Sequence, residues 1–249
     1  MTSSVPRPIS APQAVTFDCW GTLVVERDTR AAYASRVSAL QRCAAAAGAA
    51  VESARARDAL DAAWRRHWSL WHEEVASGAR EMARWALAEL GVFEAAAAEA
   101  LSREFSEAAL ASEIVPLAGA RATLERLNEA GVRRALICDT GFTPGRIVRR
   151  LLANAGLLEL LEILVFSDEA GVPKPHAKVF RSALEALGVP AGAALHVGDL
   201  RRTDVAGARA AGMRTVRIRD HHDDQSAHPE ADHVVESHAE LQQILRLGD

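Results

Sequence analysis

The chain has 249 residues, of which 49% are hydrophobic and 25% charged, the balance of an ordinary soluble globular protein. Its length suits one large domain, or a core with a smaller inserted domain, and excludes a mini-protein. The 29 Lys and Arg residues and 33 Asp and Glu residues give a formal net charge of −4, which excludes a basic nucleic-acid-binding surface as the dominant feature.

The N-terminal segment, residues 1–12, is rich in Ser and Pro, and we expect it to be a disordered tail. It lacks the apolar run of a signal peptide. No stretch of about 18 uncharged apolar residues occurs, so we expect no membrane span and no membrane partner. Three cysteines are too few for a disulfide framework and lack zinc-ligand spacing. These features predict a cytoplasmic protein.

The first predicted strand is Ala14–Asp18, a β-rich run that ends in an acid, and residues 21–23 follow it as a turn. Residues 28–112 then change in character. They are rich in alanine, contain no proline, and place apolar residues at helical spacing, which predicts several helices. The breaks between these helices are expected at three glycines, Gly48, Gly78 and Gly91.

After Pro116, predicted strands and helices alternate. The strands are predicted at residues 134–138, 163–166, 194–197, 215–218 and 233–235. The helices are predicted at residues 120–130, 145–155, 177–187, 204–211 and 241–247. This alternation predicts right-handed βαβ units and a parallel sheet.

The expected fold class is therefore α/β, a Rossmann-like parallel sheet core with helices on both faces. An all-helical cap is inserted after the first strand. The core domain is expected to comprise residues 13–27 and 113–249, and the cap domain residues 28–112.

Side chains suited to chemistry follow the predicted strands, and ligands of open parallel sheets bind beyond the carboxyl ends of the strands. Asp18 follows the first strand, and residues 138–140, Cys-Asp-Thr, follow the next. Lys174 comes shortly after the third strand, and Asp199 and Asp204 come after the fourth. We therefore expect three carboxylates and one lysine to meet at one edge of the sheet.

Carboxylates that share a site repel one another unless a cation is present, and an oxygen-only ligand set suits Mg²⁺, which keeps several waters and binds substrate phosphate. A carboxylate can also act as a nucleophile, and a nearby lysine can neutralise charge on the transferred group. These residues thus predict a Mg²⁺ site that can bind phosphate and support aspartyl-phosphate chemistry.

Several motifs of the chain resemble those of the haloacid dehalogenase-like hydrolase superfamily. Residues 17–23, Phe-Asp-Cys-Trp-Gly-Thr-Leu, resemble its first motif, and residues 172–175, Val-Pro-Lys-Pro, its third. Residues 196–204 resemble the fourth, a Gly-Asp motif with a second acid. The helical insertion resembles the first cap type of the family. The resemblance extends from about residue 15 to the C-terminus, with the motifs in the family's order on predicted strand ends.

The resemblance implies a role for each matching residue. Asp18 would be the nucleophile, and Lys174 the charge-balancing lysine. Asp18, Asp199, Asp204 and the backbone carbonyl of Trp20 would hold Mg²⁺.

Two positions depart from the pattern of the family. Family phosphatases usually carry an aspartate two residues after the nucleophile as general acid and base, where this chain has Trp20. The second motif usually places Ser or Thr at the strand end, where this chain has Cys138, a weak hydrogen-bond donor. Either Cys138 or the nearby Thr140 would then contact the transferred group, and Trp20 would lie beside the substrate.

Three functions remain open at this point. The first is Mg²⁺-dependent hydrolysis of a small phosphorylated metabolite through an aspartyl-phosphate, which the metal-binding pair Asp199 and Asp204 favours. The second is hydrolysis of a 2-haloacid through an aspartyl ester, which Trp20 favours. The third is a catalytically degenerate protein that only binds a ligand. The sequence names no substrate and allows a monomer or a homodimer.

Within the predicted cap, four apolar residues recur at helical spacing, and we expect this stripe to belong to the core of the cap. The stripe is Trp64, Trp68, Trp71 and Val75. His67 and His72 beside it are expected to be solvated, as is the segment 220–224. Spacing alone selects none of the cap arginines Arg30, Arg36 and Arg42 as a ligand for substrate.

Overall fold

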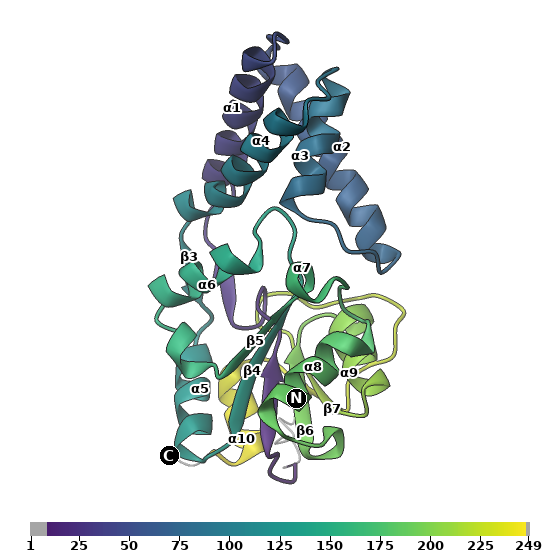
Figure 1. Ribbon diagram of the computed structural model, residues 1–249. Coiled ribbons are helices and arrows are strands. Elements are labelled where there is room, and N and C mark those ends of the chain that lie inside the picture. The colour runs from purple at the N-terminus through teal and green to yellow at the C-terminus, as the bar shows by residue number, and fades with distance from the viewer. Residues whose placement is uncertain (1–8, 248–249) are drawn as a thin grey trace.

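The computed structural model describes residues 9–247, and Figure 1 shows a sheet-containing core below a helical cap. Positions 1–8 of the predicted disordered tail lie outside the described residues. The rest of that segment packs on the core, where the backbone N–H of Ile9 donates to the carbonyl of Ile244 at 3.0 Å. No described helix is long and apolar enough to cross a membrane.

The core sheet has six strands that pair in parallel, as the sequence predicts, and their order is β5-β4-β1-β6-β7-β8. The strands are β1 (Ala14–Phe17), β4 (Arg133–Cys138), β5 (Ile163–Phe166), β6 (Ala194–Gly198), β7 (Arg214–Ile218) and β8 (His233–Val235). The first strand is central, because Phe17 pairs with Leu136 of β4 on one side and with Val197 of β6 on the other. The loops after these strands therefore meet at one edge of the sheet.

Helices cover both faces of the sheet, which confirms the predicted fold class (Figure 1). They are α5 (Ala120–Glu129), α6 (Gly145–Asn154), α7 (Ser167–Ala170), α8 (Ala177–Leu187), α9 (Ala206–Ala210) and α10 (His238–Leu245). Along β4, Leu136 and Cys138 pack with α5, α6 and α10, whereas Ala135 and Ile137 pack with α8 and α9. Alternate residues of a strand point to opposite faces, so an unbroken apolar strand builds two hydrophobic layers.

Four helices form the cap, in which apolar side chains share one cluster. They are α1 (Arg30–Ala46), α2 (Ser53–His72), α3 (Ala79–Glu89) and α4 (Ala95–Glu107). The predicted breaks hold: Gly48 and Gly91 follow helix ends with φ of 82° and 79°, which favour glycine, and Gly78 precedes α3. The abundant alanines leave room for close packing of the helices around larger residues such as Phe105.

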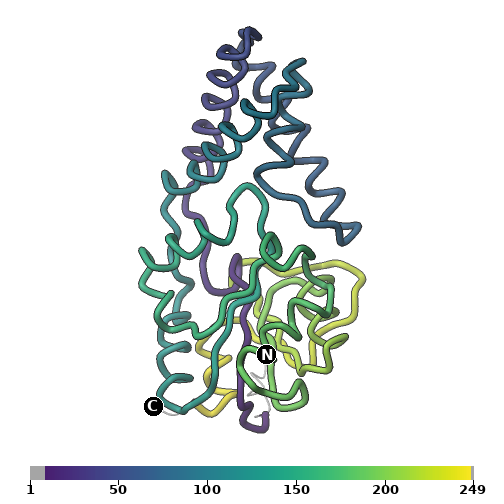
Figure 2. Tube along the Cα trace, viewed as in Figure 1, coloured from purple at the N-terminus to yellow at the C-terminus, as the bar shows by residue number. Residues whose placement is uncertain are grey.

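Two short antiparallel strands connect the cap to the core, and the sequence analysis missed both. They are β2 (Val24–Glu26) and β3 (Ile114–Pro116), which pair as the chain leaves the core and returns to it (Figure 2). A strand of three residues is too short to show an alternating pattern. The pairing ties the two connecting segments together below the cap.

Helix boundaries differ from the prediction at two places. Residues 201–205 form a π-helical turn before α9, where a regular helix was expected from residue 204. The last helix begins at His238, three residues before the expected start, because the Ser237 side chain accepts from the backbone N–H of Glu240 and caps it.

Close packing of α8 and α9 generates a prediction for Gly207. A Cβ atom there would lie 2.4 Å from Cε2 of Phe180 and 2.8 Å from the carbonyl oxygen of Pro175. We expect Gly207→Ala to lower the free energy of unfolding by about 1–3 kcal/mol, measured by urea denaturation. Gly192→Ala is the matched control, because no heavy atom lies within 4 Å of its Cβ. Equal stability of the two variants would contradict the prediction.

Candidate active site

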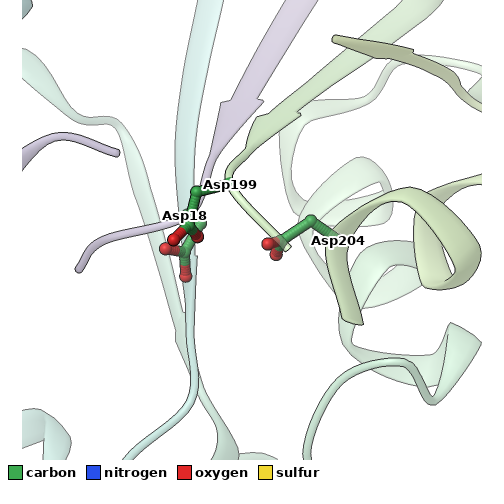
Figure 3. A group of neighbouring side chains, drawn as sticks. All are labelled: Asp18, Asp199 and Asp204. Carbon is green, nitrogen blue, oxygen red and sulfur yellow. The ribbon is translucent and has the colours of Figure 1, made fainter. Parts of the chain in front are cut away.

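Three buried carboxylates converge at the carboxyl edge of the sheet (Figure 3). Asp18 follows β1, Asp199 follows β6, and Asp204 lies in the π-helical turn before α9. Each offers an oxygen within 4.8 Å of the oxygens of the other two. Their exposed fractions are only 6%, 7% and 1%. The expected convergence of strand-end acids therefore takes place.

Lys174, in the loop that follows α7, lies between two of these acids. Its Nζ donates to Oδ1 of Asp18 at 2.5 Å and to Oδ1 of Asp204 at 2.6 Å. Burial opposes the charge of Lys174, but the carboxylates of Asp18 and Asp204 raise its pKa well above the usual value. The lysine is therefore a permanent cation in the floor of the site.

Asp204 receives more donors than the other acids. His196 Nε2 lies 3.3 Å from Oδ1, and the backbone N–H of Leu200 donates to Oδ2 at 3.0 Å. Burial would raise the pKa of Asp204, but the charge of Lys174 and the bond from His196 hold it well below its usual range. Thr16 lies 2.7 Å from Nδ1 of His196 and so fixes the ring. The sequence analysis missed His196, whose position inside a buried strand looks structural.

Too little positive charge lies near Asp18 and Asp199 to offset the cost of burying these carboxylates. Burial, opposed by Lys174, raises the pKa of Asp18 to about 7. Burial and the carboxylates of Asp18 and Asp204 raise the pKa of Asp199 to about 8. Three acids thus face one lysine, and an oxygen-only cluster with surplus negative charge fits a divalent cation such as Mg²⁺.

Two glycines permit this crowding. A Cβ at Gly21 would lie 2.8 Å from Oδ2 of Asp199, and a Cβ at Gly198 would lie 2.3 Å from Cγ of Asp204. Larger residues at either position would push the acids apart.

The remaining predicted residues are divided between the cavity and the core. Trp20 and Thr140 line a cavity above the carboxylates, whereas Cys138 is buried in the hydrophobic core below them. The Thr140 hydroxyl lies 3.0 Å from Oγ of Ser167 and donates to Asp168 at 3.1 Å. The thiol of Cys138 contacts Cys19, and this contact with burial raises its pKa well above the usual value.

The cavity has a volume of about 550 Å³ and lies between the carboxylates and the cap. Helix α2 contributes Trp64, His67, Trp68 and Trp71 to it, so the expectation that the tryptophans form the core of the cap was wrong. The face of α2 that packs into the cap consists of small and aliphatic residues, among them Ala56, Ala59, Leu60 and Ala63. The tryptophans occupy the neighbouring face of the helix, and their side chains line the cavity.

The surroundings of His67 also differ from expectation. His67 is buried rather than solvated, with Nδ1 2.7 Å from Oγ of Ser77, and burial lowers its pKa. The segment 220–224 is a loop with residues 220–222 exposed, as expected, and it is anchored where Asp224 accepts from the backbone N–H of Arg201 at 2.7 Å. This anchored segment brings His221 to the wall of the cavity.

Trp71 joins the cap to the core. Its Nε1 donates to Oδ2 of Asp139 at 2.8 Å, and Oδ1 of Asp139 accepts from the backbone N–H of Lys174 at 2.9 Å. The guanidinium of Arg202 lies 3.7 Å from the centre of the Trp71 ring and donates to its carbonyl at 3.4 Å. A single cap side chain is therefore linked to the lysine loop through Asp139 and contacts the turn that carries Asp204 through Arg202.

Comparison with known proteins identifies relatives of this chain. Residues 12–212 match the family described as haloacid dehalogenase-like hydrolase. The glyceraldehyde 3-phosphate phosphatase of Pyrococcus abyssi is 41% identical over 98 residues, 39% of this chain and 40% of that protein. The pyrimidine 5'-nucleotidase YjjG of Escherichia coli is 36% identical over 55% of this chain and 60% of that protein. The chain thus matches only about half the length of these two relatives.

A longer match is the phosphoserine phosphatase of Thermus thermophilus, 33% identical over 77% of this chain and 71% of that protein. The solved 2-haloacid dehalogenase of Pseudomonas syringae superposes with a TM-score of 0.67 at 24% identity, covering 94% of this chain and 97% of that one. A phosphatase structure from Thermococcus onnurineus superposes with a TM-score of 0.62 at 23% identity, covering 93% and 97%. Both structures share the fold of this chain.

The raised pKa values of Asp18 and Asp199 generate a prediction for the metal-free protein. Both carboxyls keep a proton in the folded state that they release near pH 4 when unfolded, so their contribution to stability is fully present below pH 4 and is lost as pH rises toward 7 and 8. In EDTA we expect the thermal midpoint to decrease as the pH is raised from 6.5 to 8. The pKa values of His67 and His196 are lowered and lie below this range, so these histidines do not contribute to the decrease. Asp199→Asn should show a smaller fall by circular dichroism. Equal slopes for the two proteins would disprove this assignment.

Proposed function

The chain belongs to the haloacid dehalogenase-like hydrolase family and is an enzyme of the hydrolase class; from this premise we propose that it hydrolyses small phosphorylated metabolites with Mg²⁺ as cofactor and Asp18 as nucleophile. The observation that carries the proposal is the cluster of three buried carboxylates around Lys174 below a cavity that the cap lines. Three relatives named as phosphatases or a nucleotidase support a phosphoryl substrate. A cytoplasmic location and a monomeric or homodimeric state stay predictions.

In this proposal, Oδ of Asp18 attacks phosphorus, the P–O bond to the leaving group breaks, and an aspartyl-phosphate forms. Water then attacks phosphorus and releases inorganic phosphate and free Asp18. Asp18, Asp199, Asp204 and the backbone carbonyl of Trp20 would hold Mg²⁺, which supplies positive charge to the phosphoryl oxygens when bound.

The other residues have separate tasks. Lys174 balances charge beside the attacking carboxylate, and the hydroxyl of Thr140 contacts the transferred group from the next strand. Asp139 has a positioning task, because its two oxygens accept hydrogen bonds from Trp71 and from the backbone of Lys174. With Trp20 in the place of an acid, the leaving group departs as a stable anion or takes its proton from another cavity-lining group.

A second candidate is release of halide from a 2-haloacid through an ester of Asp18. The observation that favours it is Trp20, because a departing halide needs no proton. The surplus of carboxylates disfavours it, since attack on carbon requires no metal and leaves the excess negative charge of the three acids without a second cation to balance it.

The nucleophile assignment predicts the effect of Asp18→Asn. We expect phosphate release from a panel of phosphorylated metabolites to require Mg²⁺, to stop in EDTA, and to fall about 10³-fold or more in the variant, because an amide is a poor nucleophile. The measurement is inorganic phosphate, with halide measured in parallel on 2-haloacids. Full turnover by Asp18→Asn would overturn the assignment. Halide release that EDTA leaves unchanged would establish the second candidate, and silence on both panels in all conditions would favour a protein that only binds.

The contact between Trp71 and Asp139 predicts the effect of Trp71→Phe. The variant keeps a ring below Arg202 but loses the N–H donor to a buried carboxylate, an interaction worth about 1.5 kcal/mol or more. We expect kcat/KM for phosphate release to fall about tenfold and the thermal midpoint to fall by about 3–6 °C. Trp85→Phe is the control, because Trp85 lies in the cap outside the cavity and packs with Arg66. Equal kinetics of the two variants would show that the N–H does not contribute.

A further inference from the structure

The part of the cavity formed by α2 has open aromatic faces. Trp64 and Trp68 line the cavity, yet 42% and 49% of their surfaces are exposed. The only other large hydrophobic residues in the described chain with such exposure are Val75 and Phe93, and neither lines the cavity. Aromatic surface of this kind is costly to leave in water, and a ligand that covers it gains binding energy.

Neighbouring groups hold these two rings in place. Trp64 stacks on Phe142 with 5.5 Å between ring centres and 11° between ring planes, and Trp68 stacks on Trp71 at 4.7 Å and 30°. Phe142 is itself fixed by an edge contact with Phe105 at 5.2 Å. Trp71 is held by the core contacts described above. The two open faces therefore belong to a rigid wall, which lowers the entropy cost of binding.

The guanidinium of Arg36 lies beside this wall. Arg36 lines the cavity, its guanidinium lies 4.7 Å from the centre of the Phe142 ring, and its Nε donates to the carbonyl of Phe105 at 3.1 Å.

Among the described residues no carboxylate lies within 4 Å of Arg36, although Glu26 lines the same cavity. By contrast, Arg30 and Arg42 at the two ends of the same helix pair with Asp28 and Glu104. The terminal N–H groups of Arg36 are thus left to donate to acceptors on a ligand.

We propose that the leaving group of the substrate carries a flat heteroaromatic ring, which stacks on the open faces of Trp64 and Trp68 and presents its acceptor-bearing edge to Arg36. The inference rests on the proposed function for the phosphoryl end of the substrate. The cavity volume of about 550 Å³ accommodates a phosphoryl group and a ring together. Stacking tolerates many rings, so the wall selects a class of leaving group rather than one compound.

A matched pair of substrates tests this selection. Uridine 5'-monophosphate and ribose 5-phosphate carry the same primary phosphoester, and only the first has a ring system of the proposed kind. We expect kcat/KM to be at least about tenfold higher for the nucleotide, and Trp68→Leu to reduce this ratio about tenfold, mainly through KM. Trp85→Leu is the matched control and should leave the ratio unchanged. A wild-type ratio near one, or an equal loss in both variants, would overturn the proposal.

Binding of the bare leaving groups tests the ring site without catalysis. We expect titration calorimetry to detect uridine or inosine binding to the Mg²⁺-loaded protein, no binding of ribose, and weakened binding in Trp68→Leu. Nucleoside binding that depends on Trp68, together with no phosphate release from any ester, would support the ring site and refute the proposed function. Phosphate release without ring preference, together with no nucleoside binding, would refute the ring site and leave the proposed function standing.

Discussion

The buried ammonium of Lys174 between Asp18 and Asp204 is the interaction on which the rest of this structure depends. Each partner would be strongly destabilising alone, because an isolated charge removed from water costs several kcal/mol. Together they neutralise part of their charge, but only if a loop after β5, a strand end and a helical turn meet within hydrogen-bond distance. The parallel sheet supplies this meeting point, since all its strands end at one edge, and His196 and Asp139 fix the orientation of the acid and of the lysine backbone.

The crowding also sets the electrostatic character of the site. One lysine cannot balance three buried acids, so Asp18 and Asp199 have pKa values raised to about 7 and about 8 by burial and mutual repulsion. Gly21 and Gly198 allow the backbone to approach the carboxylates so closely that a side chain at either position would clash with Asp199 or Asp204. A site built to hold surplus negative charge at such cost is explained by a cation and an anionic substrate that share it.

The sequence predicts the part of this arrangement that follows from alternation. Strands alternating with helices determine the parallel sheet, and the rule that ligands bind beyond strand ends locates Asp18, Lys174 and the acids of the fourth motif. The orientation of the cap helices was harder to predict, because helical spacing shows that an apolar stripe exists but not which neighbour the stripe faces. Trp64 and Trp68 recur with the spacing typical of core residues. The small residues beside them nevertheless pack more closely and occupy the interior of the cap. Arg36 resembles its neighbours in sequence and differs only in lacking a carboxylate within reach, which no local pattern encodes.

Helix α2 both contacts the core and forms the aromatic wall of the cavity. Trp71 is linked to the lysine loop through Asp139 and contacts the turn that carries Asp204 through Arg202, while the rings one and two turns earlier on the same helix face the cavity. Trp68 is itself stacked on Trp71, so a ligand ring that stacks on Trp68 extends the same aromatic stack. Binding of the proposed leaving group would therefore stabilise the position of the cap in which Trp71 contacts Asp139 and Arg202. In such an arrangement the energy of recognising the leaving group acts on the reacting centre, and selectivity appears in the rate as well as in affinity.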